Sequence, residues 1–364
     1  MEIIEFIQKI NILTNSKREY DTYSYIFKEY IDFLETRLKL NASDTKAVCQ
    51  LAIMYYEDRR DVAVCLGLME DALKKYELCI SKESICELLN NIAYFYDVEC
   101  GDDIKAELAL KRAIELNSDY PSSYYALAYL KAESNPSFAL DIIKHISFKG
   151  NLPIQYKFLH GYILMRNYLF EDALKYFEDL SQHNDVEIVE KSLYNCAIIY
   201  SINGEASKSS IIAEKLFRGY KEGENVAVST FELIHLFFIL QNYEKVVGLF
   251  GAEKIENIYV DVQIIKLLFY ALNNLGLKAE CEKTFQNKTN EIMNEINEIE
   301  IDSDISDIEK LDYIKDYQND LKVLSQHYLD IVLNNVVVKV DDNFYYSKSN
   351  QQCYLIDCPR HFVE

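Results

Sequence analysis

The sequence has little glycine and proline and no tryptophan. Ten glycines and four prolines make up about 4% of the 364 residues, whereas an average protein has roughly 12%. An all-β fold needs turn residues every few positions, and a Rossmann or P-loop enzyme needs glycine in its phosphate-binding turn. The scarcity of both residues therefore argues against these classes.

Long apolar runs and basic clusters are absent as well. No stretch of 18 uncharged apolar residues occurs, and the first residues lack the basic region and cleavage site of a signal peptide. The formal net charge is -21, from 38 basic and 59 acidic residues, and a field of that sign repels nucleic acid and anionic lipid. The nine cysteines, an odd number, are scattered. We therefore expect reduced thiols, a cytoplasmic location, and no nucleic-acid or membrane partner.

A repeat of roughly 34 residues is present instead. Ala173, Phe177 and Leu180 follow the spacing A-x3-F-x2-L, and Gly161 lies twelve residues before Ala173. The same frame recurs through the pairs Ala93 and Ala106, Ala128 and Ala139, Ala197 and Ser209, Ile234 and Val246, and Phe269 and Cys281, with a degenerate opening at Leu51, Ala52 and Tyr55. This pattern resembles the tetratricopeptide repeat, in which small residues at positions 8 and 20 let two helices approach closely.

The resemblance implies an all-α fold, a right-handed α-solenoid of helix pairs. One residue is inserted near Gly101, and Gly204 and Gly276 fall at turns between paired helices. We predict four regions: an N-terminal helical cap over 1–40, with stripes that include Ile3 to Ile10 and Tyr30 to Leu34; about six to seven repeats over 41–287; acidic capping helices over 288–330; and a tail over 331–364.

The tail has a different period. Val336, Val338 and Val340 alternate, and 341–343 read as a turn, so we predict a small β-hairpin or meander. Such a piece is marginal alone. It needs either the end of the solenoid as support or a second partner protein that pairs with its open edge strand.

No sequence motif indicates catalysis. Cys353, Cys358 and His361 have the spacing C-x4-C-x2-H, which is part of a zinc site at most, because a fourth ligand is not evident. The same residues supply a Cys–His pair without a recognisable orienting acid or amide. We expect no metal, no cofactor and no enzymatic activity.

The resemblance also implies where binding occurs. In this family the first helix of each pair lines a concave groove, and an Asn at position 6 hydrogen-bonds the backbone of an extended peptide. An amide suits this role because it offers a donor and an acceptor together. Asn91 and Asn195 fall at position 6. The other predicted groove residues are Tyr125, Tyr129, Tyr162, Arg166, His235, Tyr270, Asn273 and Asn274, although 29 tyrosines place some there by abundance alone.

The predicted function is a non-enzymatic scaffold or adaptor that holds an extended protein or peptide segment in this groove. Two alternatives stay open. One is a peptide-responsive regulatory receptor, because Rap-type receptors are similar arrays preceded by a short helical bundle. The other is an accessory subunit of an enzyme or of a defence complex.

Overall fold

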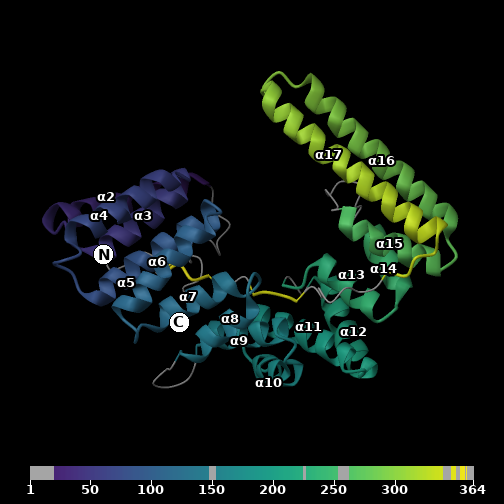
Figure 1. Ribbon diagram of the computed structural model, residues 1–364, viewed down its shortest axis with the longest axis horizontal. Helices are drawn as coiled ribbons and strands as arrows, with labels where there is room; N and C mark the ends of the chain where they lie inside the picture. Colours follow the sequence, from purple (N-terminus) through teal and green to yellow (C-terminus); the bar gives the residue numbers. More distant parts are fainter. Residues whose placement is uncertain are drawn as a thin grey trace. The chain divides into compact units, whose positions relative to one another are not determined.

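The computed structural model describes residues 20–146, 153–223, 227–252, 262–338, 346–349, 353–356 and 358. Helices form consecutive pairs within this part of the chain (Figure 1). The expected helix over Ile3 to Ile10 lies outside it. The α-helices are α2 (Tyr20–Leu40), α3 (Thr45–Arg59), α4 (Val62–Tyr76), α5 (Lys82–Tyr94), α6 (Asp103–Leu116), α7 (Pro121–Lys131), α8 (Pro136–Lys144), α9 (Ile154–Arg166), α10 (Phe170–Leu180), α11 (Val186–Ile202), α12 (Ala206–Glu222), α13 (Thr230–Ile239), α14 (Tyr243–Ala252), α15 (Val262–Asn274), α16 (Lys278–Ile301) and α17 (Asp307–Tyr328).

The turn between paired helices recurs with one left-handed residue. Gly204 and Gly276 have φ values of 78° and 75°, and Tyr168 and Gln241 occupy the same repeat position at 60° and 57°. The N–H after the left-handed residue donates back across the turn, as in the 2.8 Å bond from Glu205 N to Tyr200 O. This closure satisfies carbonyls that the helix end would leave unpaired.

Positions 8 and 20 of the repeats pack as the spacing predicts. Ala197 is fully buried, and the Ser209 hydroxyl donates to its carbonyl oxygen at 2.7 Å. The Cys65 thiol donates in the same way to Ala52 O at 3.0 Å. Burial raises the pKa of Cys65 to about 11, so this thiol serves packing rather than chemistry.

The residue inserted near Gly101 is taken up within a helix. α5 continues into η1 (Phe95–Glu99), one turn of π-helix. A π-turn holds one residue more than an α-turn without breaking the helix. The small residues Ala93 and Ala106 stay fully buried on either side of it.

Tyrosines at repeat position 11 connect successive pairs. Tyr55 donates to Glu35 at 2.8 Å, and the Tyr200 hydroxyl donates to Glu178 at 2.5 Å. Tyr96 makes the same contact with Glu70 at 2.5 Å, a hydrogen bond that raises the pKa of Tyr96 to about 12. Part of the tyrosine abundance is therefore structural.

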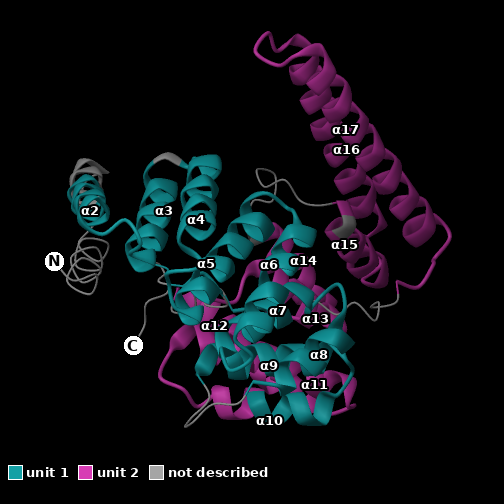
Figure 2. Ribbon diagram, turned by 60° about the vertical axis from the view of Figure 1, so that its left-hand side comes forward, with its two compact units in different colours: residues 1–176, 348–364 teal, residues 177–347 magenta. Residues whose placement is uncertain are grey.

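The chain divides into two compact units (Figure 2). Unit 1 comprises residues 1–176 and 348–364, and unit 2 comprises 177–347. In unit 2, α16 runs unbroken through residue 288, and Ser306 and Glu309 form a capping box that begins α17. Among the described helices, none combines the length and the apolar character needed to cross a bilayer.

The predicted β-hairpin is not supported. After η3 (Leu329–Leu333) the described residues 335–338, 346–349, 353–356 and 358 contain no strand, and Val340 and the expected turn 341–343 lie outside them. Side chains of the helices, rather than a neighbouring strand, bind the described backbone of the tail. An open edge strand for a second partner is therefore unsupported as well.

Candidate functional site

Asn195 binds the backbone of Ser347 within unit 2. Asp185 caps α11 by accepting from Ile188 N, and the helix then carries Asn195 into a fully buried position. Its Nδ2 donates to Ser347 O at 3.0 Å, and its Oδ1 accepts from Ser347 N at 2.9 Å. One side chain thus satisfies both polar groups of one residue's backbone.

Asn91 makes the same pair of bonds within unit 1. It lies on α5 at the equivalent repeat position and is fully buried. Its Nδ2 donates to Ile356 O at 3.3 Å, and its Oδ1 accepts from Ile356 N at 2.8 Å. Two repeats therefore use one residue type for one geometric task.

Asn273 on α15 makes a one-sided version of this contact. Its Nδ2 donates to Ile331 O at 3.1 Å and lies 3.3 Å from Asn335 Oδ1. Its own Oδ1 is buried and has no hydrogen-bond partner among the described residues. Asn273 therefore binds the start of the C-terminal segment through one backbone carbonyl, whereas Asn91 and Asn195 each bind both an N–H and a carbonyl.

A buried ion pair surrounds the Ser347 side chain. Lys191 Nζ lies 2.9 Å from both carboxylate oxygens of Glu232, whose side chain is 1% exposed. The Ser347 hydroxyl donates to Glu232 Oε1. Glu232 also accepts from Ser229 N at 2.6 Å and thereby closes the capping box that begins α13. The subsite thus accepts a small hydroxyl side chain beside a neutralised carboxylate.

Lys348 occupies a cation subsite in unit 1. Its Nζ lies 2.5 Å from Glu133 Oε1, and 5.8 Å and 5.7 Å from the ring centroids of Tyr129 and Tyr162. Such ring faces attract a cation electrostatically. Burial by itself raises the pKa of Glu133. The hydrogen bond and the charge of Lys348 lower this pKa by more than burial raises it, so the net shift is downward.

Tyr354 fills a phenol subsite in unit 1. Its hydroxyl donates to Asp97 Oδ2 at 2.8 Å and lies 3.3 Å from Ala93 O. Its ring centroid is 5.4 Å from that of Tyr94 and 5.5 Å from that of Tyr129. Burial, with the Asp97 charge, raises the pKa of Tyr354, and burial raises the pKa of Asp97.

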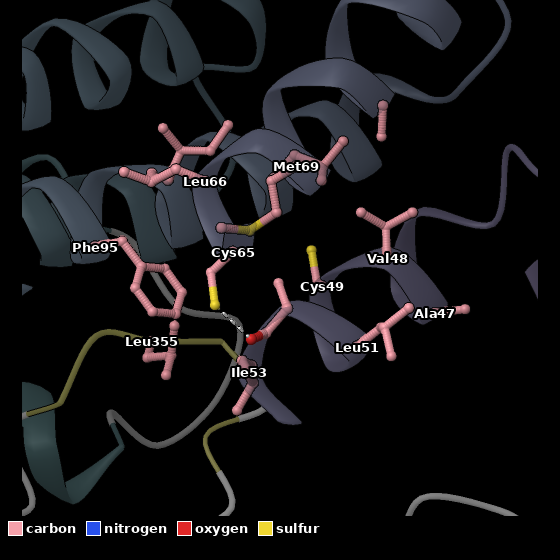
Figure 3. Packing of buried hydrophobic residues seen from close by; sticks show 14 of the residues in the cluster. Ala47, Val48, Cys49, Leu51, Ile53, Cys65, Leu66, Met69, Phe95 and Leu355 are labelled. Carbon is pink, nitrogen blue, oxygen red and sulfur yellow. Dashed lines mark hydrogen bonds between the residues drawn. The ribbon is translucent and has the colours of Figure 1, made fainter. Parts of the chain in front are cut away.

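The next tail residues enter the hydrophobic core of unit 1. Leu355 and Cys358 are 9% and 7% exposed and belong to the cluster around Cys65 and Phe95. Figure 3 shows Leu355 beside Phe95 and Ile53. This end of the tail is therefore anchored by apolar burial.

The remaining predicted residues have other surroundings. The Tyr125 ring packs against Tyr156 in a tilted arrangement, with ring centroids 4.2 Å apart, and Asn274 donates to Tyr270 O of its own helix at 2.8 Å. Arg166 ends α9, and its charge helps to lower the pKa of Glu133. Tyr270 packs at 5.5 Å from Phe238. Burial, aided by the charge of Lys266, lowers the pKa of His235 to about 4.

Several charged residues of the site were missed by the sequence reasoning. The repeat frame places Lys191 at position 2, Glu232 at position 6, Asp97 at position 12 and Glu133 at position 13, all groove positions. The frame therefore placed them at groove positions but gave no reason to single them out. What it did not supply was the tail segment that they bind.

The tail cysteine Cys353 lies beside Cys358 in unit 1. Hydrogen bonding to Cys358, together with burial, raises the pKa of Cys353, whereas a nucleophilic thiol needs a lowered pKa. His361 lies outside the described residues. Within the part of the chain that the structure describes, no three metal-binding side chains cluster.

Comparisons with known proteins give structural neighbours only. No family model and no curated protein matches the chain. It is similar to a tetratricopeptide repeat protein from Parabacteroides merdae (15% identity, 74% of this chain and 98% of that one, TM-score 0.47). It is also similar to a Rap protein in complex with competence and sporulation factor (16%, 84% and 94%, 0.42) and to apo RapI (14%, 92% and 94%, 0.34). Because these TM-scores are below 0.5, the function proposed next rests on contacts within this chain.

Proposed function

We propose that the protein is a non-enzymatic scaffold whose first helices bind an extended peptide or protein segment. One observation carries the proposal: Asn91 and Asn195, at the same position of two repeats, each hydrogen-bond both polar groups of one residue's backbone. Because each contact addresses the backbone, it accepts any residue except proline, which has no N–H to donate.

Burial makes these amides demanding. An asparagine side chain that is fully buried and unpaired costs about 1–3 kcal/mol. Asn91 and Asn195 therefore each need a peptide group to pair with. Tyr129 and Tyr162 add broad contact surface at low cost in side-chain entropy. A site of this kind takes an extended chain, and the neighbouring charged subsites select its side chains.

The test is affinity capture from the cells that make the protein, with bound proteins and peptides identified by mass spectrometry. Wild type is compared with the Asn91→Ala/Asn195→Ala variant, and Asn274→Ala is the matched control because its amide bonds to its own helix. We expect a partner retained by wild type and control and lost from the double variant. A partner retained equally by all three, or by none, contradicts the proposal.

A further inference from the structure

We infer that the described tail residues 346–349, 353–356 and 358 act as a tethered ligand of the helices that hold them within each unit, and that an external ligand must displace them. This inference deepens the proposed function and rests on it. The external ligand is an extended peptide with the chemistry of the tail: a small hydroxyl residue followed directly by a cation, then, six residues beyond the cation, a phenol followed by an aliphatic side chain.

The tail is held as a bound peptide is held. Its described residues form no strand or helix, and Ser347 and Ile356 have their backbone groups satisfied by asparagine side chains. A structural segment more commonly pairs its backbone in a helix or sheet. Here Asn195 of unit 2 binds the tail backbone at Ser347, and Asn91 of unit 1 binds it at Ile356. Helix side chains of unit 1 also contact the described residues Lys348 and Tyr354.

The subsites define which side chains the ligand needs. Glu232 accepts from the hydroxyl of Ser347, Glu133 and two tyrosine faces receive Lys348, and Asp97 accepts from the phenol of Tyr354. All three acceptors are carboxylates, in a chain of net charge -21. An acidic residue in place of Ser347 would put a second carboxylate beside Glu232, whose charge Lys191 already neutralises. The site therefore rejects it, because one of the two buried carboxylates would have no cation.

Tethering gives the tail a large advantage over a free peptide. A segment on a short linker has an effective concentration on the order of 1 mM. If the contacts themselves correspond to a dissociation constant of about 1 µM, the tail weakens binding of the same peptide from solution by about 1,000-fold. The ligand that normally displaces the tail must therefore bind more tightly or be linked to a further contact.

The experiment uses the full chain and a labelled synthetic peptide that copies residues 345–359, in reducing buffer. Ser347→Pro/Ile356→Pro removes the two N–H groups that donate to the asparagines and substitutes no residue of a helix. Val337→Pro, at an exposed tail residue, is the matched control. Fluorescence anisotropy is expected to show the peptide binding to the double-proline variant at least 100-fold more tightly than to wild type or to Val337→Pro.

Two further comparisons assign the binding to the site. Adding Asn91→Ala/Asn195→Ala to the double-proline variant is expected to abolish the gain, and a peptide with Ser347→Glu is expected to bind at least 10-fold more weakly. If the prolines prevent folding, full-length Ser347→Ala and Tyr354→Phe remove only one hydroxyl each. Each is expected to tighten peptide binding several-fold, and unchanged affinity in both overturns the inference.

The outcomes separate this inference from the proposed function. Equal affinity of the peptide for wild type and for the folded double-proline variant overturns the competition but leaves peptide binding standing. No binding to a double-proline variant that is folded, and whose tail has become sensitive to protease, contradicts the peptide-binding function itself. Loss of stability without any gain in peptide affinity shows that the tail is a structural part of the array.

Discussion

The buried pair of Lys191 and Glu232 shows how single residues shape this site. Lys191 Nζ lies 2.9 Å from Glu232 Oε1, so the two opposite charges neutralise each other, and the Glu232 side chain is almost fully buried. The same carboxylate caps α13 and accepts from Ser347. Because one side chain serves the ion pair, the helix start and the tail, its environment tolerates little change.

Lys191→Met should therefore be strongly destabilising. Removing one partner leaves a buried carboxylate without its cation, and such a loss costs about 3–5 kcal/mol. Lys191→Met/Glu232→Gln should recover at least half of that cost, because the amide is neutral and still accepts from Ser347. Urea unfolding followed by circular dichroism measures both values, and a single variant as stable as wild type would contradict this account.

Part of the site was predictable at the residue scale. The repeat frame singled out Asn91 and Asn195 because position 6 and amide chemistry coincide there. The charged residues at neighbouring frame positions gave no such signal, since a charge on a helix is usually solvated. Only the structure places Ser347 beside Glu232, because sequence spacing does not reveal which distant segment of the chain contacts the groove positions of a repeat.

At the scale of elements, the turn between paired helices offers a direct test of the repeat. Gly204 and Gln241 occupy equivalent turns with φ values of 78° and 57°. A residue with a side chain is strained in this conformation by about 1 kcal/mol, whereas glycine is not. A Cβ built on Gly204 meets nothing within 4 Å, so backbone conformation alone decides the effect.

Gly204→Ala should lower the free energy of unfolding by about 1 kcal/mol, and Gln241→Gly should raise it by about 0.5–1 kcal/mol. Thermal melts and urea titrations compare each variant with wild type. Opposite signs at equivalent turns are the expected result. The same sign for both variants would mean that contacts of the Gln241 side chain outweigh the backbone conformation.

The elements were more predictable than the tail. Residues at repeat positions 8 and 20, mostly small and eleven to thirteen apart, marked the helix pairs, because close helix packing requires small residues at fixed positions. The alternation of Val336 and Val338 indicated a strand, since period two is the usual sign of one. It failed because alternation does not specify a pairing partner, and the described tail binds asparagine side chains instead of a second strand.

The whole molecule consists of two compact units, and each holds its own part of the tail. Unit 2 binds Ser347 through Asn195, and unit 1 binds Ile356 through Asn91. In a repeat array, stability is approximately a sum of local and nearest-neighbour terms. Disturbing one end of the tail should therefore loosen the helices that hold that end.

Hydrogen exchange measured by mass spectrometry can resolve this division. Ser347→Pro should accelerate amide exchange in α11 and α13, and Ile356→Pro should accelerate it in α5. Each loses a hydrogen bond and leaves a buried asparagine oxygen unpaired, a cost of about 1–2 kcal/mol or roughly 5- to 30-fold in local opening. Val337→Pro should leave both regions at wild-type rates. If either proline accelerates exchange equally in all of these helices, the tail stabilises the array as one cooperative body, and the local account of its two ends is wrong.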